Sequence, residues 1–239
     1  MVKRLLDKVI VITGGTSGIG LEIARHSISQ GAYVVISGRR ENEGKSIVTQ
    51  LGEKCQFMEC DVLYEDQICK LVEETFSKHG RIDVMFNNAG APDFIRNIED
   101  ISYDKIRHSL DLLLTSVIIG TREVTKIMSK QKYGSIINTA SIAGHWGGCG
   151  GSVYSAAKAG VIHFSKVTSL ELAKYNIRVN SISPGAIITE IFGVGQKLTG
   201  EKLSISDDHL KSSDAFNDFQ PIQRAGLPED IASLAVYLA

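Results

Sequence analysis

Three polar side chains in the second half of the sequence have the types and spacing of a proton-transfer site: Ser141, Tyr154 and Lys158. Tyr154 and Lys158 are four positions apart in a segment rich in good helix formers, so both project from one helix face. A positive charge held near a phenol favours the phenolate and moves its pKa from about 10 toward neutral pH. The Ser141 hydroxyl can hydrogen-bond the oxygen that gains or loses the proton. By itself the Tyr-x-x-x-Lys pair is a weak signal, because such a pair more often consists of two solvated helix residues, so its meaning depends on the elements around it.

A glycine-rich loop near the N-terminus predicts a phosphate-binding turn. The apolar run Val9–Thr13 is typical of a buried strand, and it leads into GGTSGIG at residues 14–20. From Gly18 to about Gln30 the apolar residues recur at helical spacing. Glycines at a strand-to-helix turn let backbone N–H groups approach a pyrophosphate at the positive end of the helix dipole. A second strand at 33–37 completes a strand–turn–helix–strand unit, which is typical of dinucleotide binding.

Taken together, these motifs make the sequence resemble the short-chain dehydrogenase/reductase family over nearly its whole length. The motifs that carry the resemblance are, in chain order, Thr13-Gly14-x-x-x-Gly18-x-Gly20, Asp61-Val62, Asn87-Asn88-Ala89-Gly90, Ser141, Tyr154-x-x-x-Lys158 and Pro184-Gly185. The resemblance implies an NAD(P)-dependent oxidoreductase that transfers a hydride between a nicotinamide cofactor and a small-molecule alcohol or ketone. It assigns Tyr154 as general acid/base, Lys158 as the group that lowers the Tyr154 pKa and holds the nicotinamide ribose, and Ser141 as the group that orients the substrate oxygen.

The resemblance also assigns cofactor contacts to the loops. It implies that Asp61 accepts a hydrogen bond from the adenine amino group, with a helix N-cap as its alternative role. The small residues of 87–90 let the chain pass close to the adenosine ribose, and their amides can tie neighbouring strand ends together. Ile187 and Thr189 resemble the groups that hold the nicotinamide carboxamide. The expected cofactor-binding set is Gly14, Thr16, Ser17, Gly18, Ile19, Gly20, Arg39, Asp61, Val62, Asn88, Ala89, Gly90, Tyr154, Lys158, Pro184, Gly185, Ile187 and Thr189. No metal site is expected.

The residues that follow the second strand favour NADP over NAD. NAD binders usually carry a carboxylate here, which accepts from the ribose hydroxyls and repels a 2′-phosphate. This sequence has Gly38 instead, followed by Arg39 and Arg40. Two guanidiniums offer charge-assisted partners to a 2′-phosphate. Alternatively, both arginines are solvated surface charges that Glu41 or Glu43 can neutralise, which leaves NAD open.

One position departs from the family pattern. Aligned backward from Gly120 and Met128, the family's catalytic asparagine falls on Leu113. That asparagine bends the long helix and helps hold a water that links the lysine to solvent, and leucine cannot form those hydrogen bonds. Either backbone carbonyls and a polar neighbour such as Ser116 hold the water, which we favour, or the proton relay is weakened. A non-redox cyclase or isomerase that keeps bound NAD(P) is therefore an alternative function, and a dinucleotide-sensing protein a third.

Strands and helices alternate along the chain. Strands are expected at 9–13, 33–37, 56–59, 84–86, 135–138 and 178–182, and helices at about 18–30, 65–78, 103–130, 154–174 and from 228. This alternation predicts parallel pairing. With right-handed crossovers it gives an α/β fold, a single-domain Rossmann-type doubly wound parallel sheet with helices on both faces. The motif loops all fall at the carboxyl ends of strands, where such sheets bind ligands.

Composition agrees with one domain over 1–239, because 239 residues with 43% hydrophobic content can bury one substantial core. A net charge of −1 without blocks of like charge argues against nucleic-acid and membrane partners. The apolar runs are too short to span a bilayer and the first residues lack a signal-peptide pattern, so we expect a cytoplasmic protein. Reduced thiols without metal-ligand spacing are expected at Cys55, Cys60, Cys69 and Cys149.

The substrate side is expected to consist of two segments. The glycine-rich stretch 145–151 indicates a pliant wall, and residues from about 190 to 220 resemble the family's substrate lid. Candidate wall residues are Phe94, Ile95, His145, Trp146 and Cys149. A structural role is an equal alternative for the histidine and the cysteine. An apolar or amphipathic alcohol or ketone is the expected substrate.

The end of the sequence is a second departure from the family. Family members usually continue beyond the position of Ala239 into a last strand that supports the oligomer. We therefore expect that the chain is shortened or that its last residues are missing. A homotetramer or homodimer is the expectation that the family implies.

Overall fold

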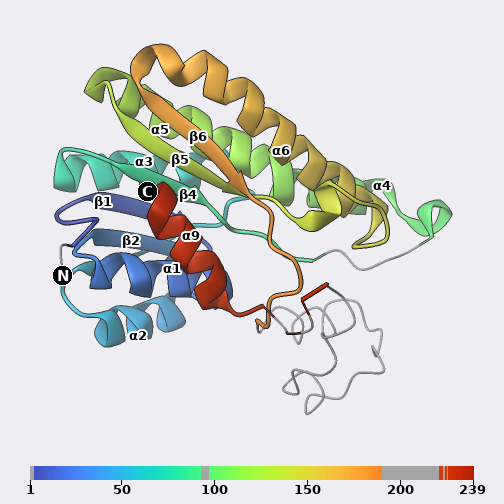
Figure 1. Ribbon diagram of the computed structural model, residues 1–239, viewed down its shortest axis with the longest axis horizontal. Helices are drawn as coiled ribbons and strands as arrows, with labels where there is room; N and C mark the ends of the chain where they lie inside the picture. Colours follow the sequence, from blue (N-terminus) through green and yellow to red (C-terminus); the bar gives the residue numbers. More distant parts are fainter. Residues whose placement is uncertain (1–2, 93–96, 190–220, 223, 225) are drawn as a thin grey trace.

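The structure is a computed structural model of the 239-residue chain, and it describes residues 3–92, 97–189, 221, 222, 224 and 226–239. Its centre is a parallel sheet in the order β3-β2-β1-β4-β5-β6 (Figure 1). The strands are β1 Val9–Thr13, β2 Tyr33–Gly38, β3 Cys55–Glu59, β4 Val84–Asn87, β5 Gly134–Thr139 and β6 Ile177–Ile182. The order reverses between β1 and β4, as in a doubly wound sheet, so the predicted fold class is confirmed.

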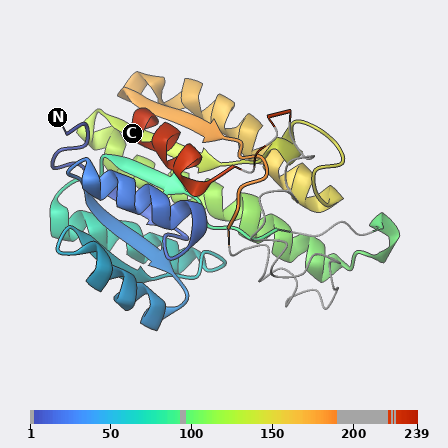
Figure 2. The ribbon, with the colours of Figure 1, turned by 60° about the horizontal axis from the view of Figure 1, so that its bottom comes forward.

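Helices cover both faces of the sheet (Figure 2). They are α1 Gly18–Ser29, α2 Glu41–Leu51, α3 Glu65–His79, α4 Tyr103–Leu110, α5 Ser116–Gln131, α6 Ser152–Leu172 and α9 Pro228–Leu238. Short 3-10 turns occupy Ile98–Asp100, Ile142–Gly144 and Ala173–Tyr175. The sequence patterns missed α2, because this helix is mostly polar and only its Gly44 and Ile47 are buried.

The sheet separates two hydrophobic cores, and alternate residues of the central strand serve one core each. Ile10 and Ile12 of β1 pack with Ile23 of α1 on the face that α1, α2 and α9 cover. Val11 points to the opposite face and packs in the cluster that includes Val124 of α5. Because β1 and β4 are buried on both faces, they read as continuous apolar runs rather than alternating ones.

The predicted long helix at 103–130 is interrupted, and this corrects the sequence expectation. A π-helical turn, Asp111–Thr115, separates α4 from α5. The N–H of Ser116 donates to the Asp111 carbonyl five residues back, and the Ser116 hydroxyl donates to the Leu112 carbonyl at 2.7 Å. The irregular turn lies at Leu113, so the helix changes its winding here without the family's asparagine.

Two further features concern the chain as a whole. All four cysteines are free, and burial raises the pKa of the Cys60 thiol to about 12. Among the helices that the structure describes, none combines the length and apolar character needed to cross a bilayer.

Candidate active site

The site lies where the loops after β1, β4, β5 and β6 meet at the carboxyl edge of the sheet. The Thr13 hydroxyl at the end of β1 accepts from the backbone N–H groups of Asn88 at 3.0 Å and Ala89 at 3.1 Å. The N–H of Ile142 after β5 donates to the Pro184 carbonyl after β6 at 3.1 Å. Parallel pairing of β1 with β4 and of β5 with β6 brings these loops to one edge. The loop motifs predicted to form the site therefore come together.

Ser141, Tyr154 and Lys158 converge from two elements. Ser141 caps the 3-10 turn after β5, and its hydroxyl accepts from the N–H of Ala143 at 3.2 Å. Tyr154 and Lys158 lie in the first two turns of α6, which begins two residues earlier than predicted. The Lys158 Nζ is 5.8 Å from the centre of the Tyr154 ring. The helical spacing thus places phenol and ammonium near each other, with the serine hydroxyl close enough to influence the phenol.

Burial dominates the electrostatics of this site. It raises the pKa of Tyr154 above its ordinary value of 10, and contact with the Ser141 hydroxyl lowers it by less. Burial also lowers the pKa of Lys158 to about 8. Lys158 is only 4% exposed, and its ammonium donates to the carbonyl oxygen of Thr139 at 2.7 Å. Burial is thus the larger of the two influences on the Tyr154 pKa in this structure, and the expected lowering of that pKa by Lys158 stays a prediction.

The glycine loop fits a dinucleotide pyrophosphate. Gly14 and Gly18 have φ angles of 64° and 50°, which favour glycine. A Cβ at Gly20 would overlap the Gly14 carbonyl and lie 2.6 Å from the Asn88 amide nitrogen, so the chain approaches itself closely here. Ser17 caps α1 without a side-chain hydrogen bond, and the N–H groups of 18–20 have no acceptor among the described residues. Such free donors, together with the helix dipole, suit an anion.

The residues expected to hold the adenine end lie between β3 and α3. One carboxylate oxygen of Asp61 accepts from the N–H of Leu63 at 3.1 Å, and the N–H of Asp61 donates to the Gln67 side chain at 2.7 Å. The N-cap of α3 is Tyr64, so the alternative role of Asp61 as a helix N-cap is wrong. Asp61 instead shapes the loop through a local Asx turn.

The two arginines that follow β2 differ in their ion pairs. Arg40 forms an ion pair with Glu43 at 2.8 Å, and Glu41 pairs with Lys45 on the same helix. Arg39 has no carboxylate partner among the residues that the structure describes. A Cβ at Gly38 would lie 3.1 Å from the Thr16 hydroxyl, so the glycine loop packs directly against this strand end. The anticipated neutralisation by glutamate thus applies to Arg40.

The segment after β6 reaches over the glycine loop. Ile187 forms a parallel bridge with Gly226 through the Ala186 carbonyl and the Ile188 N–H, both at 2.9 Å. In such a bridge the N–H of Ile187 itself points away from the partner. The Thr189 methyl lies about 3.2 Å from the position a Cβ would take at Gly18. The two expected carboxamide residues and the glycine loop are therefore neighbours.

The wall predicted after Ser141 is described in part. His145 Nε2 lies 3.0 Å from the Ser183 hydroxyl, which ties this stretch to the loop before Pro184. Trp146 is 65% exposed, and Cys149 is also exposed. Phe94, Ile95 and the proposed lid at 190–220 lie outside the described residues.

Leu113 lies close to the Lys158 ammonium. It is 2% exposed, and its δ-methyl lies 3.2 Å from the position that a Cβ would take at Gly90. That same position is 3.9 Å from the Lys158 Nζ. The leucine thus contributes an apolar surface next to the buried ammonium, while the nearby Ser116 hydroxyl donates to the Leu112 carbonyl.

Sequence reasoning missed two residues that build the site. Thr13 supplies the hydroxyl that holds the loop after β4, and Thr139 supplies the carbonyl that receives Lys158. The threonine that opens the glycine motif was a signal for the first. A backbone carbonyl has no side-chain signature, so nothing in the sequence marked the second.

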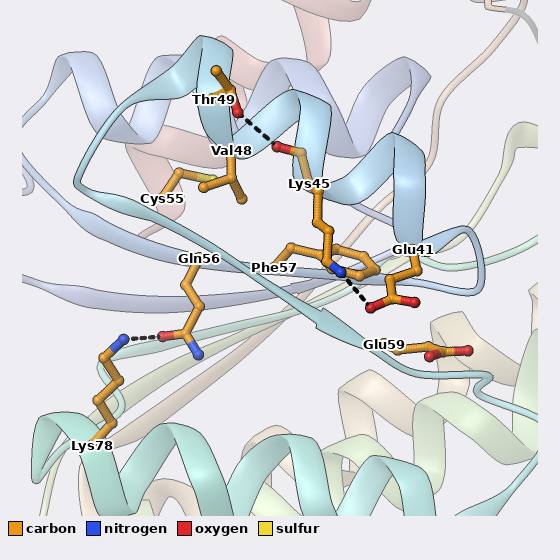
Figure 3. A pocket seen from close by; sticks show the side chains of 9 residues that line it. All are labelled: Glu41, Lys45, Val48, Thr49, Cys55, Gln56, Phe57, Glu59 and Lys78. Atoms are coloured by element: carbon orange, nitrogen blue, oxygen red, sulfur yellow. Dashed lines mark hydrogen bonds and ion pairs between the residues drawn. The ribbon is translucent and has the colours of Figure 1, made fainter.

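One hollow of the surface lies apart from this site. A hollow at the β3 edge of the sheet is lined by α2, β3 and Lys78 of α3 (Figure 3). Four of its polar side chains are paired, because Lys45 pairs with Glu41 and Lys78 donates to Gln56 at 2.7 Å. Within the described ranges no group of three His, Cys, Asp or Glu side chains could hold a metal ion.

Known proteins are similar to this chain in sequence and in structure. A family model described as short chain dehydrogenase matches residues 8–197. The 3-oxoacyl-[acyl-carrier-protein] reductase FabG of Chlamydia pneumoniae is 36% identical over 98% of this chain and 90% of its own length. The (+)-borneol dehydrogenase 2 of Salvia officinalis is 34% identical over 99% of this chain and 84% of its own. The crystal structure of levodione reductase superposes with a TM-score of 0.88 at 29% identity, covering 98% of this chain and 90% of that one.

Proposed function

The chain belongs to the short-chain dehydrogenase/reductase family, and on that premise we propose that it is an NAD(P)-dependent oxidoreductase with Tyr154 as its general acid/base. As a dehydrogenase/reductase of this family it acts on alcohol or ketone groups. The observation that carries the proposal is the convergence of Ser141, Tyr154 and the buried Lys158 at the sheet edge that also holds the glycine loop. A proton donor and a dinucleotide cradle are thus adjacent.

Different residues of this chain would bind different parts of the cofactor. The free N–H groups of 18–20 would hold the pyrophosphate, Asp61 and Val62 the adenine, and Ile187 and Thr189 the carboxamide. Lys158 would hold the nicotinamide ribose. When bound, the dinucleotide supplies the hydride for ketone reduction or accepts it in alcohol oxidation.

Tyr154 exchanges the proton. In reduction its hydroxyl donates a proton to the substrate oxygen, and in oxidation its phenolate takes the proton from the substrate hydroxyl. The Ser141 hydroxyl hydrogen-bonds the same oxygen and fixes its position. Because burial raises the Tyr154 pKa, the phenol is protonated at neutral pH and prepared for reduction. The Lys158 ammonium, with a pKa of about 8, keeps most of its charge at that pH.

The substrate that we propose is an uncharged, apolar or amphipathic ketone or alcohol. The names of relatives refer to 3-oxoacyl groups, borneol and levodione. In this chain, Trp146 follows Ser141 by five positions, and its exposed ring offers an apolar surface.

Spectrophotometry tests the reaction class. The wild-type protein is incubated with NADPH or NADH and a panel of ketones, and with NADP or NAD and the matching secondary alcohols, while absorbance of the reduced nicotinamide is followed. We expect substrate-dependent turnover with at least one pair. Dinucleotide binding without turnover on any member of the panel would instead favour a non-redox enzyme that keeps NAD(P).

The cofactor that we propose is NADP. Its support is Arg39, whose guanidinium is not paired with a carboxylate in the described chain, and the absence of a carboxylate at Gly38. Arg39→Gln is expected to raise the KM for NADPH about tenfold, the loss of one charge-assisted hydrogen bond. Arg40→Gln is the matched control, because Arg40 is already paired with Glu43. Equal effects of the two substitutions, or a lower KM for NADH than for NADPH in the wild type, would contradict the assignment.

We also propose that 1–239 is one domain that assembles as a homodimer or homotetramer. Leu170 on the outer face of α6 is 80% exposed, and Val167 one turn before it is 41% exposed. Apolar side chains gathered on a helix surface suit a subunit contact. Light scattering coupled to size exclusion is expected to give a mass at least twice that of the monomer, and Leu170→Glu a smaller mass. A monomeric wild type would contradict this.

A further inference from the structure

A continuous line of hydrogen bonds joins the glycine loop to the catalytic lysine. The Asn88 amide nitrogen donates to the carbonyl of Thr13 at 3.1 Å and to that of Gly14 at 3.2 Å. The Asn88 amide oxygen accepts from the Thr139 hydroxyl at 3.3 Å. The Thr139 carbonyl in turn receives the Lys158 ammonium at 2.7 Å. The ends of β1, β4 and β5 are thus connected to α6 through the side chains of Asn88, Thr139 and Lys158.

The Asn88 side-chain amide forms its hydrogen bonds within the protein. Both of its donor directions and its acceptor oxygen are engaged, so the side chain has little capacity left for the dinucleotide. The amide nitrogen also packs against the first turn of α1, where a Cβ at Gly20 would lie 2.6 Å from it. Asn88 therefore holds the loop that we propose cradles the pyrophosphate, in agreement with the expectation that the amides of 87–90 tie neighbouring strand ends together. Its role as a direct cofactor contact stays a prediction.

Thr139 connects these hydrogen bonds to Lys158, one of the residues that we propose take part in the reaction. It is the last residue of β5, directly before the turn that carries Ser141. Its carbonyl is the acceptor of an ammonium that is 4% exposed, and a buried charge depends strongly on each hydrogen bond it has. The Thr139 hydroxyl, through Asn88, fixes the peptide that presents this carbonyl.

We propose that Thr139 is a positioning residue whose hydroxyl bond to Asn88 sets the Lys158 ammonium relative to the dinucleotide loop. The proposal rests on the proposed function, in which Lys158 holds the nicotinamide ribose. Its consequence is energetic coupling: the Thr139 hydroxyl contributes to dinucleotide affinity through Lys158, although it does not itself touch the dinucleotide.

A double-mutant cycle read by binding tests the coupling without turnover. Calorimetry measures the Kd for NADP in the wild type, Thr139→Val, Lys158→Met and the double variant. Valine removes the hydroxyl at nearly constant volume. We expect Thr139→Val to raise the Kd about fivefold in the wild type, within the strength of one buried hydrogen bond. In the Lys158→Met background we expect the same substitution to change the Kd less than about twofold.

Two further variants separate positioning from general structure. Thr139→Ser keeps the hydroxyl and is expected to restore wild-type affinity. Thr125→Val removes a threonine hydroxyl that donates to the Thr121 carbonyl within α5, and it is expected to leave the Kd unchanged.

The outcomes are distinct. An equal effect of Thr139→Val in both backgrounds, no effect in either, or failure of Thr139→Ser to restore affinity would overturn the proposal. If the wild type itself binds neither NADP nor NAD, the proposed function fails and this inference fails with it. Binding by the wild type with no coupling overturns the positioning role alone.

Discussion

The pKa values of Lys158 and Tyr154 shift chiefly because both side chains are buried. Their spacing and their contact with Ser141 could be predicted from the sequence, because the helical period places positions four apart on one face. The direction of their pKa shifts could not, since it depends on how completely the neighbouring loops exclude water. Likewise, the pairing of Arg40 rather than Arg39 with a glutamate follows from the start of α2, which the sequence pattern did not mark.

The lowered pKa of Lys158 predicts a pH-dependent contribution to stability. Below about pH 8 the ammonium is charged in both the folded and the unfolded chain, and the folded state carries the full desolvation cost. Between about pH 8 and the unfolded value of 10.5 the folded protein has released this proton while the unfolded chain still holds it, so this contribution to stability rises with pH. We expect the free energy of unfolding of the wild type, relative to Lys158→Met, to increase by roughly 2 kcal/mol from pH 7 to pH 10.

Urea unfolding of both proteins at the two pH values measures this difference. Comparison with the variant cancels the opposing contributions of the buried thiols, whose raised pKa values make stability fall above pH 9. A difference between wild type and variant that is constant with pH, or that falls as pH rises, would contradict the burial argument.

Leu113 gives a second prediction at this scale. The change of winding at 111–115 and the contact with the loop at Gly90 already exist with leucine, so asparagine adds little to the geometry. We expect Leu113→Asn to leave kcat/KM within about tenfold of wild type, or 1.4 kcal/mol in barrier terms. Steady-state kinetics on the two proteins measures it. A gain of several hundredfold would show that the native proton relay is weakened by the leucine.

At the scale of elements, loops and helix ends position the side chains of the candidate site. The glycine turn between β1 and α1 was predictable, because glycine content and helical periodicity change together at Gly18. The π-helical turn was not, because its residues Asp-Leu-Leu-Leu-Thr continue the apolar helical pattern. The wide turn depends instead on tertiary contacts, such as that of Leu113 with Gly90, and on the Ser116 hydroxyl bond to Leu112.

The close approach within the glycine loop predicts a sensitive position at Gly20. A methyl group there would meet the Gly14 carbonyl and the Asn88 amide, both part of the loop that we propose holds the dinucleotide. We expect Gly20→Ala to weaken NADP binding at least about tenfold and to destabilise the fold by about 1–3 kcal/mol, typical of overpacking. Calorimetry and urea unfolding measure the two effects. Gly147→Ala is the control, because a Cβ at Gly147 meets nothing within 4 Å; similar losses in both variants would refute the steric argument.

The whole molecule follows from the alternation of strands and helices. Parallel strands buried on both faces read as continuous apolar runs, which is why the doubly wound sheet could be predicted. Topology then brings the loops after β1, β4, β5 and β6 to one edge, so the motif order along the chain becomes a single site. The amides of 87–90 were expected to tie neighbouring strand ends together, and the Asn88 amide does so at β1 and β5. Its partner Thr139 could not be identified from the sequence, because it lies 51 residues away and only the folded loops bring the two side chains together.

The central claim is that Tyr154 transfers the proton in an NAD(P)-dependent reaction, and one comparison tests it most directly. The kcat for ketone reduction with NADPH is measured for the wild type and Tyr154→Phe, together with the Kd for NADPH. We predict that removal of the phenolic oxygen lowers kcat by about a thousandfold, within the range of general acid catalysis, while the Kd stays within about threefold. A Tyr154→Phe variant that keeps kcat within tenfold of wild type would contradict the claim.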